Sequence, residues 1–246
     1  MSCVEGLLDL HRVTGEEAYL AAVVNIHHDI CANERLIIGG VSDDDHMRRA
    51  PLKPEVITEV CDAVYWVRLN AQLLRLTGEL RYADEIERTL YNTLCASSSE
   101  DGSWGVRRLS LSGEHRVSPQ HCNLKHHQCC IANLPRGLLQ SVEHAVTIDE
   151  DGIVFNLFLP GKGILESKAT GKVRFSIETE YPIGGEILIV LHPGDEKVFT
   201  LKLRVPPGAA DADLRVNDEA HTCASGRYAS ITRCWQAGDT VKLRFP

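Results

Sequence analysis

The chain has 246 residues, of which 43% are hydrophobic and 24% are charged, as in an ordinary soluble globular protein. This length suits one large domain or two smaller ones. The formal net charge of −8 argues against a nucleic-acid partner, which needs a clustered basic surface. No apolar run approaches the roughly 20 residues that cross a bilayer, so we expect no membrane partner either.

The cysteines and the N-terminus bear on the cellular compartment. Nine cysteines are an odd number, spread over a chain too long to need disulfide staples. The first residues, Met1 to Gly6, lack the basic segment and the following apolar segment of a secretory signal. These features predict a cytoplasmic protein with reduced thiols, most of them buried as small hydrophobic groups.

Residues 1–150 are predicted to be helical and contain a repeat. The segment Leu10–Glu16, followed by Tyr19, recurs as Leu73–Glu79, followed by Tyr82. In each copy an apolar helix runs into Thr-Gly, where glycine can adopt the left-handed conformation that ends a helix, and a second helix then begins. Repeated hairpins of this kind indicate a helical array or toroid.

Residues 151–246 change to a period of two. Val173, Phe175 and Ile177 alternate with polar residues, as in a strand with one face in water. Seven short strands predict an antiparallel β-sandwich, with Gly161 assigned to a turn. The strands are Ile153–Leu159, Lys172–Glu178, Glu186–Leu191, Val198–Val205, Leu214–Asn217, Arg227–Trp235 and Thr240–Phe245. We interpret this half as a packing module rather than a carbohydrate-binding one.

The adjacent pair Cys129-Cys130 is the most informative chemical signal. Three interpretations compete: two buried thiols that are neighbours by coincidence, a strained vicinal disulfide that suits a reducing compartment poorly, or a metal site. Thiolates are good zinc ligands, and His126 and His127 lie nearby in the sequence. A Cys-Cys pair alone is a weak zinc signal, so the choice depends on a second group of ligands.

Glu59 and Cys61 form that second group. On a regular helix, residues two apart point about 200° apart. Sharing a metal therefore requires a non-helical approach, with the helix beginning near Cys61, and Pro54 leaves room for such a start. The alternative role for Glu59 is a carboxylate that stabilises the helix N-terminus through its dipole.

Several separated motifs, in order, resemble the glycoside hydrolase 127 family, typified by β-L-arabinofuranosidase. The motifs are Leu36–Ser42, Glu59-Val60-Cys61, Leu73–Gly78 with Tyr82–Asn92, Cys129-Cys130 with Asn133 and Arg136, and Arg233–Val241. The resemblance implies an (α/α)6 barrel, the six-hairpin glycosidase fold, followed by β-sandwich domains. It also implies an oligosaccharide or glycoside substrate and a role in carbohydrate metabolism.

The number of helical residues limits how much of that barrel the chain can build. The hairpins repeat roughly every 63 residues, as from Thr14 to Thr77, so residues 1–150 predict only a partial (α/α)6 catalytic domain, with the β-sandwich at 151–246. Helix faces left uncovered would promote self-association.

The resemblance implies a site as well. Its zinc (Zn²⁺) ligands would be Glu59, Cys61, Cys129 and Cys130, with Cys129 as the nucleophile. The family's acid/base is a Glu after the Gly-Gly turn, a place that Asp45 takes here. Asp45 departs from the pattern because it is one methylene shorter, and the triplet Asp43–Asp45 also fits a solvated acidic loop.

We therefore expect a retaining glycoside hydrolase that acts on β-L-arabinofuranosides, in which the thiolate of Cys129 replaces the usual nucleophilic carboxylate. A coordinated thiol is deprotonated, which removes the limit set by a free-cysteine pKa of about 8.5. Two other hypotheses stay open. One is a catalytically inactive fragment or relic that keeps a structural zinc, and the other is a helical interaction module without metal.

Overall fold

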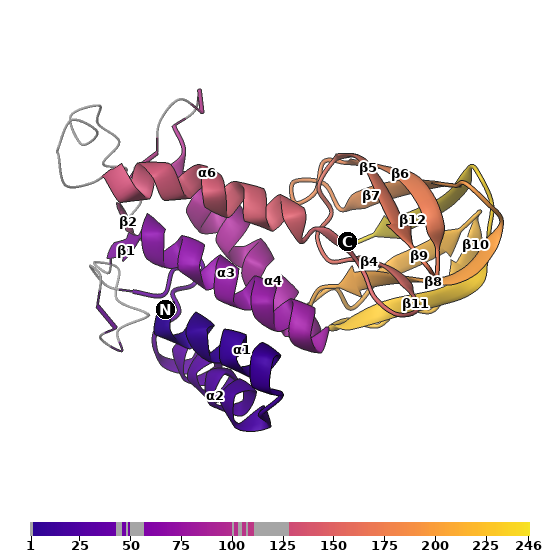
Figure 1. Ribbon diagram of the computed structural model, residues 1–246. Coiled ribbons are helices and arrows are strands. Elements are labelled where there is room, and N and C mark those ends of the chain that lie inside the picture. Colours follow the sequence, from indigo (N-terminus) through magenta and orange to yellow (C-terminus); the bar gives the residue numbers. More distant parts are fainter. Residues whose placement is uncertain are drawn as a thin grey trace. The chain divides into compact units, whose positions relative to one another are not determined.

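The computed structural model describes residues 2–42, 46–47, 49, 57–99, 101–102, 105–106, 108–110 and 128–246. The chain divides into two compact units, one ending at Ser141 and the other beginning at Val142. The first is helical and the second is built from β-sheets, as Figure 1 shows. The predicted fold class, helices followed by an antiparallel β fold, is confirmed.

The helical unit contains two helical hairpins. In the first, α1 (Ser2–Thr14) packs against α2 (Glu17–Asn33), and in the second α3 (Val60–Thr77) packs against α4 (Leu80–Arg88). The chain continues through a π-helical turn η1 (Thr89–Leu94) and a 3₁₀ turn η2 (Cys95–Ser97). The other elements among the described residues of this unit are the antiparallel pair β1 (Ile57–Glu59) and β2 (Arg108–Ser110), and the helix α6 (Gln128–Glu143). No helix within the described residues is both long and apolar enough to span a bilayer.

The repeat predicted from the sequence has the same geometry in both copies. The hydroxyls of Thr14 and Thr77 each donate to the carbonyl four residues earlier and accept the N–H two residues later. Gly15 and Gly78 follow with φ angles of 72° and 69°. The same side-chain and backbone contacts therefore end α1 and α3, and the repeat encodes one type of helical hairpin twice.

A buried polar network joins α2, α3 and α4. The ring of His27 stacks on Trp66 with the centroids 4.6 Å apart, and its Nε2 donates to Oδ1 of Asn70 at 2.8 Å. The indole N–H of Trp66 donates to the buried carboxylate of Glu85 at 3.3 Å, which also pairs with Arg35. Because these contacts cross between helices, they fix the orientation of α3, whose first turn carries one of the predicted ligands.

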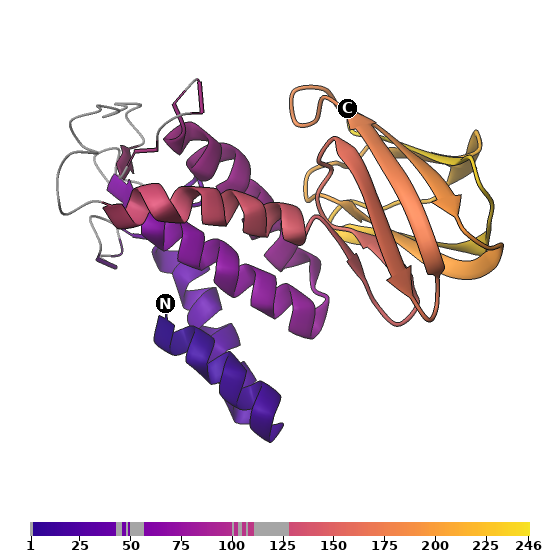
Figure 2. The same cartoon turned by 45° about the horizontal axis from the view of Figure 1, so that its top comes forward.

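The second unit is a sandwich of two sheets, seen as two layers in Figure 2. The strand orders are β10-β9-β12-β7-β6-β5 and β11-β8-β4-β3. All neighbouring pairs are antiparallel except β4 and β8. The strands are β3 (Val146–Ile148), β4 (Gly152–Phe155), β5 (Gly161–Ser167), β6 (Gly171–Thr179), β7 (Glu186–Pro193), β8 (Lys197–Val205), β9 (Asp213–Val216), β10 (Glu219–His221), β11 (Arg227–Trp235) and β12 (Asp239–Arg244). Their inward-facing apolar residues form one core between the sheets.

Five strands were not among the seven predicted: β1 and β2, within the residues expected to be helical, and β3, β5 and β10 in the second unit. The strand β3 begins at Val146, within the residues expected to be helical. The strand β5 begins at Gly161, so the assignment of this residue to a turn is wrong. A Cβ on Gly163 would lie 2.3 Å from the ring of Phe175 on β6, so that ring covers the glycine. A glycine at one inward position of an edge strand interrupts the alternation of apolar and polar residues that reveals a strand in a sequence.

Candidate metal centre and active site

Glu59 and Cys61 lie on either side of a strand-to-helix junction. Glu59 ends β1 with extended backbone angles (φ −90°, ψ 139°), and α3 begins at Val60. Its side chain makes no capping hydrogen bond to α3. The carboxylate instead accepts the thiol hydrogen of Cys130 at 3.1 Å. The non-helical approach expected from the spacing is therefore present, and the carboxylate of Glu59 contacts the cysteine pair.

Cys129 and Cys130 lie in the first turn of α6, as Cys61 does in α3. In Figures 1 and 2 both helices begin at the same end of the helical unit, beside β1 and β2. Helix N-termini present unpaired N–H groups and the positive end of the helix dipole, which favour thiolate over thiol. Two such ends meeting at one place favour negatively charged sulfur.

A glycine allows α6 to approach α3 closely. A Cβ on Gly137 would lie 2.7 Å from Cγ2 of Val64 in α3 and 3.0 Å from Cδ1 of Leu94. These separations are shorter than van der Waals contact, so only glycine fits without displacing a neighbour. The close packing of Gly137 against Val64 determines how near the cysteine-bearing ends of α6 and α3 lie to each other.

The four predicted ligands converge. One donor atom from each of Glu59, Cys61, Cys129 and Cys130 lies within 4.8 Å of the other three. The Sγ atoms of Cys61 and Cys130 are 3.3 Å apart, and those of Cys129 and Cys130 are 3.9 Å apart. A tetrahedral zinc with Zn–S bonds near 2.3 Å separates its sulfurs by about 3.8 Å. The spacing and the donor set of three sulfurs and a carboxylate both fit that ion.

The four donors differ in their exposure to solvent. Cys130 is fully buried, and Glu59 and Cys61 are 8% and 9% exposed. Cys129 is exposed. The sulfur of Cys61 also accepts a hydrogen bond from Nδ2 of Asn133, at 3.1 Å. The three sulfurs are therefore chemically distinct, and only Cys129 combines a place in the cluster with access from outside.

Contacts within the cluster shift the pKa values of its thiols. Hydrogen bonding with Cys130 lowers the pKa of Cys61 to about 6, with help from Asn133 and against the effect of burial. The same contact with Cys61, together with burial, raises the pKa of Cys130. Burial and the neighbouring Cys61 raise the pKa of Cys129. Cys61 is the first to lose its proton, and a cation that binds all three sulfurs displaces the protons of the other two.

The Gly-Gly turn that precedes the predicted acid/base packs against the same junction. A Cβ on Gly40 would lie 2.2 Å from Oγ1 of Thr58, the residue before Glu59. The hydroxyl of Thr89 in η1 donates to the carbonyl of Gly39 at 3.1 Å. These contacts fix the turn between β1 and η1. Asp45, the predicted acid/base, and His126 and His127 lie outside the described residues.

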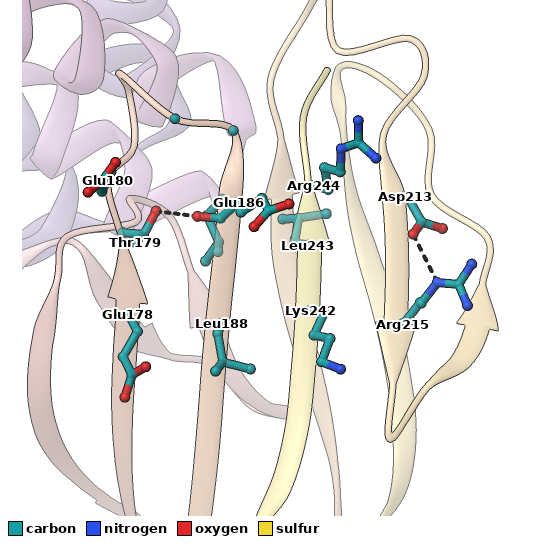
Figure 3. Close-up of a pocket in the computed structure, with 13 residues that line it drawn as sticks. Glu178, Thr179, Glu180, Glu186, Leu188, Asp213, Arg215, Lys242, Leu243 and Arg244 are labelled. Atoms are coloured by element: carbon teal, nitrogen blue, oxygen red, sulfur yellow. Dashed lines mark hydrogen bonds and ion pairs between the residues drawn. The ribbon is translucent and has the colours of Figure 1, made fainter.

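A hollow of about 730 Å³ lies on the outer face of the six-stranded sheet. Figure 3 shows its lining from β6, β7, β12 and β9, including Glu178, Leu188 and Lys242. Arg215 pairs with Asp213 at 2.9 Å, in the manner of a solvated surface. The lining contains neither cysteine nor histidine. Among the described residues, the group of potential metal donors that converges is the cysteine cluster, which is therefore the candidate site.

Asn133 is the site residue whose role the sequence did not predict. It belongs to the motif that carries the family resemblance, but nothing in that motif assigned it a partner. The available signal was its position three and four residues after Cys130 and Cys129, which places it on the same face of a helix. Its contact with a sulfur on α3 depends on how the two helices pack.

Comparison with known structures identifies similar folds. A GH127 beta-L-arabinofuranosidase from Geobacillus stearothermophilus T6 shares 25% sequence identity with a TM-score of 0.81, over 99% of this chain and 41% of that one. A GH127 beta-arabinofuranosidase shares 25% with a TM-score of 0.82, over 99% and 42%. A third structure, a glycoside hydrolase, shares 23% with a TM-score of 0.85, over 99% and 45%, and supports the fold alone. The chain spans less than half the length of these structures.

Comparison with protein families and with curated sequences completes the assignment. A search of curated proteins found no match. The family model of the beta-L-arabinofuranosidase GH127 middle domain matches residues 152–246. The model of the GH127 catalytic domain matches residues 2–142, more than half of the chain. The resemblance seen in the sequence is thereby confirmed: the chain belongs to the GH127 family of beta-L-arabinofuranosidases.

Proposed function

We propose that this protein is a retaining glycoside hydrolase that acts on β-L-arabinofuranosides through a zinc-bound cysteine nucleophile. Zinc would be held by Glu59, Cys61, Cys129 and Cys130, and Cys129 would attack the sugar. The observation that carries the proposal is the exposure of Cys129 alone among four converging donors. A nucleophile must reach the anomeric carbon of a substrate, whereas buried donors can only hold the ion.

A bound zinc would keep the coordinated thiols deprotonated at neutral pH. In the first step, Sγ of Cys129 forms a bond to the anomeric carbon while the glycosidic C–O bond breaks and a carboxylic acid protonates the leaving oxygen. In the second, that carboxylate takes a proton from water, the water oxygen bonds to the anomeric carbon, and the C–S bond breaks. Two inversions give overall retention. We assign the carboxyl group to Asp45, following the family pattern.

Glu59 has a further role in this mechanism. Its carboxylate adds negative charge to a cluster that already holds three sulfurs. Charge donated to a bound cation would weaken its hold on each sulfur, and the exposed sulfur of Cys129 would be the one free to attack. In this scheme residues 1–150 carry the chemistry and the β-sandwich at 151–246 supports them. The eight free cysteines among the described residues favour a reducing, cytoplasmic setting, although the prediction that most are buried is wrong, since only Cys61 and Cys130 of the eight are buried.

The decisive experiment compares Cys129→Ser with Cys95→Ser on an aryl β-L-arabinofuranoside. Cys95 is also exposed but lies outside the cluster, so it controls for the loss of a thiol. We expect the wild type and Cys95→Ser to release the phenol, and Cys129→Ser to lose at least about a thousandfold in kcat/KM. Undiminished turnover by Cys129→Ser contradicts the proposal. Mass spectrometry with a slowly hydrolysed substrate should locate the sugar adduct on Cys129.

A second candidate function is a structural zinc site in a protein without hydrolase activity. The burial of three of the four donors favours it, because closed sites are typical of structural zinc. It predicts stoichiometric zinc, a lower melting temperature after chelation, and no turnover on a panel of arabinosides. Clear turnover rules it out, and a helical interaction module without metal is distinguished from both by elemental analysis.

We also propose self-association through exposed helix faces. Val13 at the end of α1 and Leu139 on α6 are 85% and 69% exposed, large values for aliphatic side chains. Sedimentation of the wild type and of Val13→Glu and Leu139→Glu should show association that the acidic substitutions weaken. Monomeric wild type over the micromolar range contradicts this proposal.

A further inference from the structure

We infer that Asn133 is a positioning residue of the cysteine cluster: its side-chain N–H restrains the sulfur of Cys61 and thereby leaves Cys129 as the reactive sulfur. The inference rests on the proposed function, because it concerns which sulfur a metal-bound cluster leaves free. It assigns a specific contact to a residue outside the four proposed ligands.

The geometry places the amide at one sulfur only. Asn133 lies one turn after Cys129 and Cys130 on α6, and its Nδ2 is 3.1 Å from Sγ of Cys61 on α3. The helix α6 thus contacts the cluster twice, through its cysteine pair and through this amide. Within the described part of the chain, no other amide N–H donates to any of the three sulfurs.

The charge of the cluster gives the contact its energetic importance. Three thiolates and one carboxylate bring four negative charges against the two positive charges of a zinc ion. Cys61 and Cys130 are buried, so water cannot stabilise the excess negative charge on their sulfurs. An N–H donor at Cys61 stabilises its negative charge and draws electron density from that sulfur, which makes it a poorer nucleophile.

The surroundings of the other two sulfurs complete the asymmetry. The thiol of Cys130 contacts the carboxylate of Glu59 at 3.1 Å and has no exposed surface. Cys129 is exposed, and among the described residues only sulfur lies within hydrogen-bonding distance of its Sγ. One sulfur is therefore held by an amide and one by burial. The third keeps its full electron density and faces outward.

The experiment loads the whole chain with cobalt(II) in place of zinc and compares the wild type with Asn133→Leu and Asn133→Ala. Leucine keeps the size of asparagine without a donor, and alanine serves if leucine disturbs folding. Asn92→Leu is the control, because Asn92 is an exposed asparagine of the same unit whose amide, among the described residues, donates to the carbonyl of Arg88 alone. The readouts are the sulfur-to-cobalt charge-transfer band and cobalt affinity in competition with a chelator.

Without the amide donor, the lone pairs of Cys61 rise in energy. We expect the charge-transfer band of Asn133→Leu and Asn133→Ala to shift to longer wavelength and their cobalt affinity to fall about 10- to 100-fold. Asn92→Leu should match the wild type in both. A merely structural role would change affinity through folding and leave the band of the bound fraction in place.

The outcomes separate this inference from the proposed function. If the wild type binds cobalt with thiolate bands and both Asn133 variants have its band and affinity, the inference is overturned and the proposed function stands. If the wild type binds neither cobalt nor zinc, both fail together. A band shift with reduced affinity in the two variants, absent from Asn92→Leu, supports the inference.

Discussion

Cys61 and Cys130 are 69 positions apart in the sequence, yet their Sγ atoms lie 3.3 Å apart. Each occupies the first turn of a long helix, and α6 packs on α3 where Gly137 meets Val64. The cluster is therefore part of the packing between two helices. Substitutions that change this packing should alter metal affinity even when they lie far from the sulfurs.

The first prediction concerns Gly137→Ala. A Cβ there would lie 2.7 Å from Val64 and 3.0 Å from Leu94, and the β-branched Val64 cannot easily turn aside. We expect a loss of about 1–3 kcal/mol in the free energy of unfolding from overpacking, and at least about tenfold weaker zinc binding as α6 moves.

Gly6→Ala is the matched control, because a Cβ on Gly6 in α1 would meet nothing within 4 Å. Alanine there should raise the free energy of unfolding by about 0.5–1 kcal/mol through its helix propensity, with zinc binding unchanged. Urea unfolding and chelator competition measure the two effects. Wild-type zinc affinity in Gly137→Ala would show that the cluster tolerates a shift of α6.

The second prediction separates the buried sulfur from the exposed one. Cys130 lies between Glu59 and Cys61 with no exposed surface, whereas Cys129 is open to solvent. Cys130→Ser should lose zinc affinity by more than about a hundredfold, because a buried ligand has no substitute. Cys129→Ser should keep most of its zinc, with water able to complete the coordination.

A zinc ion that binds only the folded state would also stabilise the fold by mass action. At a free concentration a hundred times its Kd, zinc would contribute about 2.7 kcal/mol. Thermal unfolding with and without a chelator should therefore show a lower melting temperature after zinc removal for the wild type and Cys129→Ser, and little change for Cys130→Ser. If chelation lowers the melting temperatures of Cys129→Ser and Cys130→Ser equally, the proposed distinction is wrong: Cys130 would not be the sulfur that holds the ion while Cys129 reacts.

Local sequence signals predicted the parts of the fold and site that depend on local chemistry. The Thr-Gly pairs at Thr14 and Thr77 end helices by contacts within five residues, so their pattern is readable in the sequence. The need for an extended approach at Glu59 followed from helix geometry alone. The convergence of that segment with Cys129 and Cys130 came from family resemblance, because residues so distant in the sequence carry no signal of mutual contact.

Features that depend on packing between elements were not predictable in this way. The contact from Asn133 to Cys61 requires the crossing of α6 over α3. The strand β5 was not predicted because the apolar group over Gly163 is the ring of Phe175, which belongs to the neighbouring strand. In both cases the informative side chain belongs to a different element from the one being predicted.

The third prediction concerns the pH dependence of stability. Burial lowers the pKa of His27 from 6.5 to about 4, against the hydrogen bond with Asn70 that raises it. Between these values the unfolded chain binds a proton that the folded chain does not. The stability contributed by neutral His27 is therefore complete above about pH 6.5 and is lost as pH falls towards 4, by about 3 kcal/mol in total.

Replacing His27 with phenylalanine should remove this pH-dependent contribution. The difference in the free energy of unfolding between pH 7 and pH 4.5 should be smaller in His27→Phe than in the wild type by about 2–3 kcal/mol. His28→Gln, at the exposed neighbouring position, should keep the wild-type difference. Urea unfolding followed by helical circular dichroism provides the measurement. The same pH dependence in His27→Phe and the wild type would exclude His27 as its source.

The last prediction concerns Asn156, a buried residue of the β-sandwich. Its side-chain amide donates to the carbonyl of His144 at 3.1 Å and to the hydroxyl of Thr147 at 3.0 Å. Its Oδ1 accepts the hydroxyl of Tyr228 at 2.5 Å, and its backbone carbonyl accepts Nε of Arg204. One side chain thus ties the segment before β3 to β11.

Asn156→Leu would leave the carbonyl of His144 and the hydroxyl of Tyr228 without this partner in a largely buried place, at a cost of about 2–4 kcal/mol. Tyr228→Phe removes only one of these bonds and should cost about 1 kcal/mol. Hydrogen exchange measured by mass spectrometry reports each unit separately, so peptides from β8 and β11 should lose protection in Asn156→Leu while those from α3 should not. Wild-type protection of β11 in Asn156→Leu would show that its pairing with β8 holds the strand without the Asn156 side chain.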